Sequence, residues 1–95
     1  MENQYRLAAE GYDFDALLRR VAQITGLKPE QILDAQRNRS RTNARSIVFF
    51  WATDQLGITQ SRLSQMFNLT QSAISHAIRR GRELVEKNGY LMVER

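Results

Sequence analysis

With 95 residues, 42% of them hydrophobic, and a formal net charge of +4, the chain is long enough for one modest core and too short for two domains. It has no cysteine and one histidine, which excludes disulfides and thiol catalysis and argues against a metal site, and we expect no cofactor. No apolar run approaches the ~20 residues that cross a bilayer, and the N-terminus is not typical of a signal peptide, so the expected location is the cytoplasm, with no membrane partner.

The N-terminal part of the chain predicts an arm followed by a first helix. Residues 1–12 show no helical pattern and are interpreted as a flexible arm, so the single folded domain is expected to span residues 13–95. Apolar side chains then recur at helical spacing behind Asp13, which is a competent N-cap. This pattern predicts an amphipathic helix over residues 14–25 that ends at Gly26.

Two further helices are expected in the middle of the chain. Pro29 occupies a first-turn position and predicts a short second helix that extends to about Gln36. After a polar and basic stretch, the apolar spacing predicts a long third helix from Ser40 or Thr42 to Leu56.

The third helix contains a segment that also suits a strand. Residues 47–51 are β-branched and aromatic, which in isolation is typical of a buried strand. We favour a helix closed by Gly57, because no partner strand is evident elsewhere and a central helix in a bundle is apolar nearly all round. The aromatic residues expected in the core, and not as a platform for stacking bases, are Phe49, Phe50, Trp51 and Phe67.

The next part of the chain contains one pattern twice. The segments ITQSRLSQMF, starting at Ile58, and LTQSAISHAI lie eleven residues apart. Thr59 and Thr70 are each expected to cap a helix, and Asn68 between the two helices suits the left-handed backbone of a tight turn. Two helix starts this close are typical of a helix-turn-helix, which we predict over residues 59–88.

The fourth and fifth helices are expected at about residues 60–67 and 71–88, and the second of them is amphipathic. On a helical wheel its polar residues fall in an arc of roughly 140°, and its apolar residues fall on the opposite side. An ordinary solvated face is the alternative, but such a face usually carries pairs of Glu and Lys, whereas this one is uncharged near its tip. The candidate base-contacting residues are Gln71, Ser72, Ser75, His76 and Arg79.

The positive charge is concentrated around the predicted helix pair. Residues 36–82 contain eight arginines and one acidic residue, whereas residues 1–35 contain four basic and six acidic residues. This asymmetry favours a phosphate-rich partner. For the arginines before and at the start of the third helix, a solvated loop is an equal alternative. For Thr59, Ser61 and Arg62, which open the fourth helix, plain capping is the alternative. The candidate phosphate-contacting residues are Arg39, Arg41, Arg45, Thr59, Ser61, Arg62, Thr70, Arg80 and Arg82.

Residues 39–84 resemble the C-terminal DNA-binding domain of the bacterial replication initiator DnaA. The similarity lies in the basic stretch that runs into an apolar helix, RTNARSIVFFWATDQLG, and in SAISHA within the last helix. The acidic residue and histidine typical of DnaA at the start of that helix are here Thr70 and Gln71. The predicted elements give an all-α fold, a compact bundle of about five helices. The resemblance implies that this bundle is of the type found in DnaA domain IV and in the Trp repressor.

From about Phe14 the chain is similar to the DnaA-like domain at the C-terminus of REP-associated tyrosine transposases. The corresponding segments are DFDALLRRVAQITGLKPEQIL, ARSIVFFWATDQLGITQSRLSQMF and LTQSAISHAIRRGREL, with Gly81 between Arg80 and Arg82. The resemblance implies DNA binding next to a catalytic domain that cuts single strands with a tyrosine and a metal-binding histidine pair. One histidine cannot supply that pair, so we expect an excised or stand-alone binding domain that is not itself an enzyme.

The sequence therefore predicts a monomeric domain that binds double-stranded DNA sequence-specifically, as the C-terminal module of a transposase acting at repeat or palindromic DNA. A stand-alone transcription or replication regulator is an alternative, but it would need a dimer, for which only the tail at residues 90–93 offers a contact. Another alternative is a helical protein-interaction module whose basic surface binds an acidic protein. An enzyme is the weakest reading, because the chain has no glycine-rich phosphate loop, paired carboxylates, or nucleophile with a base.

Overall fold

The computed structural model describes residues 13–34 and 38–91. No strand lies within these residues, which confirms the predicted all-α fold and the choice of helix for residues 47–51. The predicted arm and the last two residues of the predicted tail, Met92 and Val93, lie outside the described residues. The described helices are α2 (Phe14–Thr25), α3 (Pro29–Leu33), α4 (Arg39–Asp54), α5 (Gln60–Phe67) and α6 (Gln71–Asn88).

Capping residues set the starts of α2, α5 and α6 and the ends of α2 and α5. The side chains of Asp13, Thr59 and Thr70 each accept a hydrogen bond from the backbone N–H three residues later, at 3.0, 3.1 and 3.1 Å. At the other end of α2, Gly26 has a φ of 77°, and Asn68 after α5 has a φ of 54°. The predicted caps and the left-handed turn residue are thus confirmed.

The end of α3 and the start of α4 differ from the predicted boundaries. Helix α3 ends at Leu33 and not at about Gln36, and the backbone of Asp34 is already extended. Helix α4 starts at Arg39, before either predicted start, because the Asn38 side chain caps it. The Asn38 Oδ1 accepts hydrogen bonds from the first two N–H groups after Arg39, at 2.9 and 3.4 Å. The basic stretch therefore belongs to a helix.

The end of α4 also differs from the prediction. The helix ends at Asp54, although we expected it to continue to Leu56. Gly57 lies in the turn beyond the helix with a φ of 72°, and the N–H of Ile58 donates to the Ala52 oxygen at 3.0 Å. This turn reverses the chain towards α5, and a residue with a side chain would be strained at Gly57.

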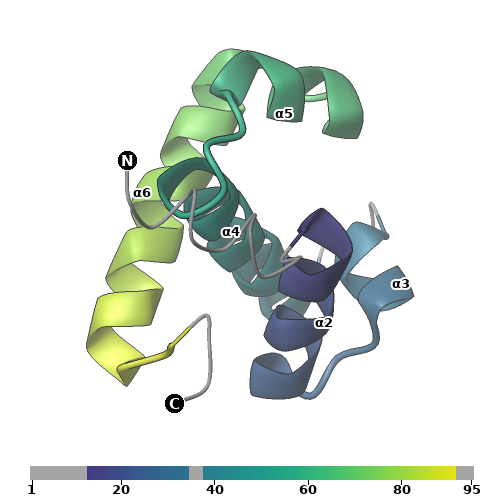
Figure 1. Cartoon of the computed structure of the whole chain (residues 1–95), viewed down its shortest axis with the longest axis vertical. Coiled ribbons are helices and arrows are strands. Elements are labelled where there is room, and N and C mark those ends of the chain that lie inside the picture. The colour runs from purple at the N-terminus through teal and green to yellow at the C-terminus, as the bar shows by residue number, and fades with distance from the viewer. Residues whose placement is uncertain (1–12, 35–37, 92–95) are drawn as a thin grey trace.

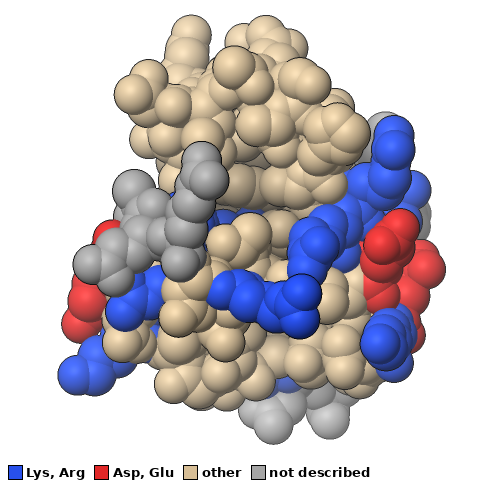
Figure 2. Space-filling model, turned by 180° about the vertical axis from the view of Figure 1, so that it is seen from behind, with Lys and Arg blue, Asp and Glu red and all other residues tan. Residues whose placement is uncertain are grey.

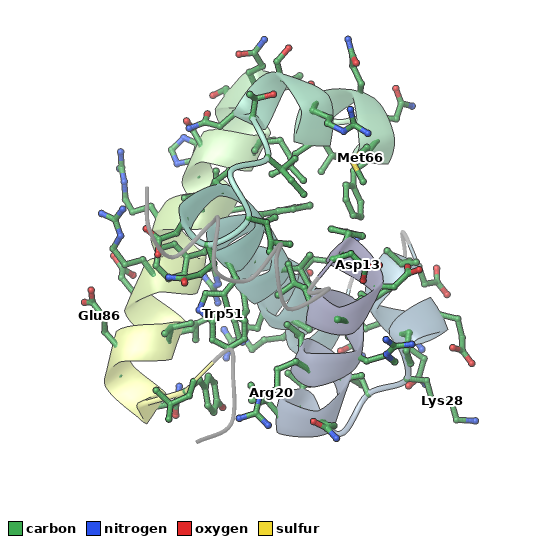
Figure 3. All side chains as sticks on the ribbon, viewed as in Figure 1. Asp13, Arg20, Lys28, Trp51, Met66 and Glu86 are labelled. Carbon is green, nitrogen blue, oxygen red and sulfur yellow. The ribbon has the colours of Figure 1, made fainter. Side chains whose placement is uncertain are left out.

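The core is built around α4, which runs through the middle of the molecule (Figure 1). It packs most extensively against α6 and also contacts α2 and α3. Residues 46–52 are all buried, so almost two turns of α4 are covered on every side, as predicted for a central helix. Figure 3 places the side chain of Trp51, which is 3% exposed, in the interior between α6 and α2.

The aromatic residues lie in or against this core, as predicted. Phe49 and Phe50 are buried, and Phe67 of α5 packs against the core. The Phe67 ring meets the Phe49 ring edge-on, with 4.7 Å between centroids, and it meets Phe14 at 6.3 Å. These contacts connect α5 to α4 and α2, so α5 is not held by α6 alone. None of the helices in residues 13–34 and 38–91 combines the length and apolar character of a membrane span.

Candidate nucleic-acid interface

Helix α6 presents its polar face outward, as the helical wheel predicts. Ile74 and Gly81 are buried on the opposite face. Next to them Ala77, Ile78, Leu84 and Val85 pack against the core. The predicted base-contacting residues are all exposed: Gln71, Ser72, Ser75, His76 and Arg79. They lie along the first three turns of α6 on one side, where they are accessible to a ligand.

The start of α5 lies beside this face of α6. The Ser75 hydroxyl donates a hydrogen bond to Oε1 of Gln60, in the first turn of α5, at 3.0 Å. Gln60 is exposed and was not among the predicted site residues. It follows the N-cap Thr59 as Gln71 follows Thr70, so the sequence repeat was the signal that could have identified it.

The predicted phosphate-contacting residues of α5 surround an open depression. Thr59, Ser61 and Arg62 are exposed, and together with Gly57, Ile58 and Gln65 they line this depression. The Thr59 and Thr70 hydroxyls both act as N-caps, so their oxygen atoms already accept a backbone hydrogen bond. A hydroxyl in that position still has its own O–H to donate to a phosphate oxygen.

The other predicted phosphate-contacting residues come from α4 and α6. Two of them, Arg80 and Arg41, contact side chains elsewhere in the molecule. Arg80 Nε donates to Oδ1 of Asn43, at 2.9 Å, and thus connects α6 to the first half of α4. Nothing in the sequence singled out Asn43. Arg41 pairs with the Asp34 carboxylate at 3.0 Å, with side chains 19% and 42% exposed, respectively. This ion pair weakens the attraction of Arg41 for a phosphate.

Gly81 explains how α6 approaches α4 so closely. A Cβ atom at this position would lie 2.1 Å from the Ser46 carbonyl oxygen and 2.9 Å from the Phe50 Cβ. Only glycine fits there, because a backbone atom blocks the space that any side chain would need. Arg82, the next residue, has its guanidinium carbon 5.5 Å from the centroid of the Phe50 ring, a cation–π contact.

The charged side chains form a band on one face of the molecule. Figure 2 shows Lys and Arg side chains across the middle of this face, with Asp and Glu at the two sides of it. Above the band, at the level where α5 and the start of α6 lie in Figure 1, the visible surface carries no charge. This face thus combines an uncharged region with an adjoining basic one.

Within residues 13–34 and 38–91 no three His, Asp or Glu side chains are grouped so that they could hold a metal ion. No protein-family model, curated protein or solved structure matches the chain.

Proposed function

We propose that this domain binds double-stranded DNA sequence-specifically, with the first turns of α6 in the major groove. One observation carries the proposal: the exposed face of α6 is uncharged over residues 71–76 and becomes basic from Arg79, close to Gly81, where α6 meets α4. A recognition helix needs short hydrogen-bonding side chains at the bases and cations where it meets the phosphates.

The side chains divide into two proposed roles. Gln71, Ser72, Ser75 and His76 are suited to base edges, since Gln pairs with adenine and Ser and His bond to several bases. Arg79 is suited to guanine, and Gln60 adds a second amide beside Ser75. The remaining cations and the two capping threonines would contact phosphates. Among the cations, Arg39, Arg80 and Arg82 are exposed, and Arg45 is half-buried.

A transposase module acting at repeat or palindromic DNA is the proposed biological setting. The resemblance to the C-terminal domain of REP-associated tyrosine transposases supports it, including the Gly81 step between two arginines. Palindromic repeats fold into hairpins, so a domain of this kind should bind a hairpin containing its site at least as well as a linear duplex. A stand-alone regulator would instead be expected to bind as a dimer.

The test is a fluorescence-anisotropy titration of this chain with a labelled duplex pool and a matched hairpin at two salt concentrations. If about 4–6 phosphates are contacted, the logarithm of the binding constant should fall with the logarithm of salt concentration at a slope of about −4 to −5. An excess of unlabelled duplex should compete. A flat salt response, or no binding at low salt, would contradict the proposal and favour a module that binds an acidic protein.

A further inference from the structure

The crossing of α4 and α6 has a defined centre with a cation on each side. At the centre, Gly81 lies against the Ser46 backbone so closely that no Cβ fits. The residues before and after Gly81 are both arginines, and both are exposed. Because Gly81 is fixed against α4, the backbone positions from which the Arg80 and Arg82 side chains extend are fixed as well.

Each of these arginines is also held by a side chain of α4. Arg80 Nε donates to Asn43 Oδ1 at 2.9 Å, and the Arg82 guanidinium lies over the Phe50 ring at 5.5 Å. The bond to Asn43 uses one of the five N–H donors of Arg80 and leaves the four terminal ones available. A cation–π contact uses none of the N–H donors of the Arg82 guanidinium, so these can still bond to an anion.

The two holding residues lie on one face of α4. Asn43 and Phe50 are seven positions apart, two turns of helix, and Ser46 lies between them on the same face. At a rise of 1.5 Å per residue the two anchors are about 10 Å apart along the axis. Two guanidinium groups anchored at that separation are suited to two different phosphates better than to one.

We propose that the α4–α6 crossing is a preorganised clamp for two phosphates of a DNA backbone, with Asn43 as the positioning residue of Arg80 and the Phe50 ring as the support of Arg82. The proposal rests on the proposed function and deepens it, because it assigns contacts that do not depend on the DNA sequence to the α4–α6 crossing. An arginine that is already held loses less rotational freedom on binding, and this makes each phosphate contact stronger.

The basic band described above supports a polyanion as the ligand. Figure 2 shows acidic side chains only at the sides of the band, so a negatively charged backbone has one favourable path across this face. On α6, Glu83 follows directly after Arg82 and Glu86 lies four residues after it, and both are exposed. They restrict the clamp to the two arginines and disfavour a path towards the C-terminal end of α6.

The test compares the variants Asn43→Ala, Arg80→Ala and the double variant with the wild-type chain in the same duplex titration at several salt concentrations. Arg80→Ala should weaken binding and make the salt slope smaller by about 0.9, because one phosphate contact is lost. Asn43→Ala removes no charge and should weaken binding about two- to tenfold with the salt slope unchanged. The double variant should bind like Arg80→Ala, because Asn43 acts only through Arg80.

A second pair of variants tests the other half of the clamp and the specificity of the effect. Arg82→Lys keeps the charge but loses the planar group on Phe50, so it should weaken binding about two- to tenfold at an unchanged slope. Thr42→Ala, an exposed neighbour of Asn43, and Lys28→Ala, on the side of the molecule away from α6 in Figure 3, are the matched controls. Both should stay within twofold of the wild type.

The outcomes separate the clamp from the proposed function. If the wild-type chain binds duplex DNA but the losses in the double variant are additive, the clamp is wrong and DNA binding stands. Full affinity in Asn43→Ala and Arg82→Lys would lead to the same conclusion. A wild-type chain that does not bind duplex DNA would overturn both. Circular dichroism of each variant excludes loss of fold as the cause of weaker binding.

Discussion

At the scale of single residues, Thr70 has one role that the structure shows and one that we propose. Its hydroxyl oxygen caps α6, and it is also a proposed phosphate contact. Thr70→Asp separates the two roles, because Asp is a good N-cap and its charge is favourable at a helix N-terminus. The free energy of unfolding should therefore stay within about 1 kcal/mol of the wild type, while DNA affinity at low salt falls.

Urea denaturation and duplex titration measure these two quantities. Thr70→Ser, which keeps the hydroxyl without adding charge, should match the wild type in both. Full DNA affinity in Thr70→Asp would mean that no phosphate approaches the start of α6.

The exposed amide and imidazole of α6 give a second residue-scale prediction. Gln71→Ala or His76→Ala should reduce the preference for the cognate site by about 1–3 kcal/mol for each lost base contact. Arg39→Ala, at the exposed start of α4, should weaken binding to all sequences alike. Titrations with cognate and scrambled duplexes measure the difference, and a uniform loss in His76→Ala would assign His76 to the backbone.

At the scale of helices, the distance between α4 and α6 depends on Gly81. Gly81→Ala would force a Cβ against the Ser46 backbone, and the cost should exceed the ~1 kcal/mol that alanine gains in a helix. We expect a net loss of about 2 kcal/mol in the free energy of unfolding, measured in urea, together with weaker DNA binding. Gly89→Ala is the control: Gly89 has a φ of +66°, and an added Cβ would meet no heavy atom within 4 Å beyond its chain neighbours. This variant should lose about 1 kcal/mol in the free energy of unfolding and keep its DNA affinity.

Helix boundaries were predictable from sequence where the signal is local. The starts of α2, α5 and α6 follow from the N-caps Asp13, Thr59 and Thr70, whose hydrogen bonds span three residues. The start of α4 lies before the predicted one, because Asn38 is one of several polar residues there that suit an N-cap. The helix ends before the predicted residue, because Gly57 is not its cap but lies in the wider turn that follows.

The arrangement of the candidate site was less predictable than its members. The exposure of the polar face of α6 follows from helical periodicity, so the sequence was sufficient for it. The contacts Asn43 to Arg80 and Gln60 to Ser75 span 37 and 15 residues and arise only when the helices pack. Nothing in the sequence specifies a crossing point, although Gly81 in the middle of a helix was a hint of one.

At the scale of the whole molecule, one core connects the described helices. The core cluster takes residues from α2, α3, α4, α5 and α6, and Trp51 lies within it. We therefore expect a single cooperative unfolding transition, in which Trp51 fluorescence and helical circular dichroism change at the same urea concentration. A helical signal that falls before the Trp51 signal would show that some helices unfold separately from the core.

The burial of residues 46–52 in the centre of α4 implies that the molecule opens first elsewhere. Amide groups of residues 46–52 should exchange with deuterium only through global unfolding, since no side of that segment is exposed. Helix α5 has one buried residue, Leu63, and its amides should exchange through smaller openings. The proposed DNA surface includes α5, so a bound duplex should slow exchange in α5 and leave the centre of α4 unchanged.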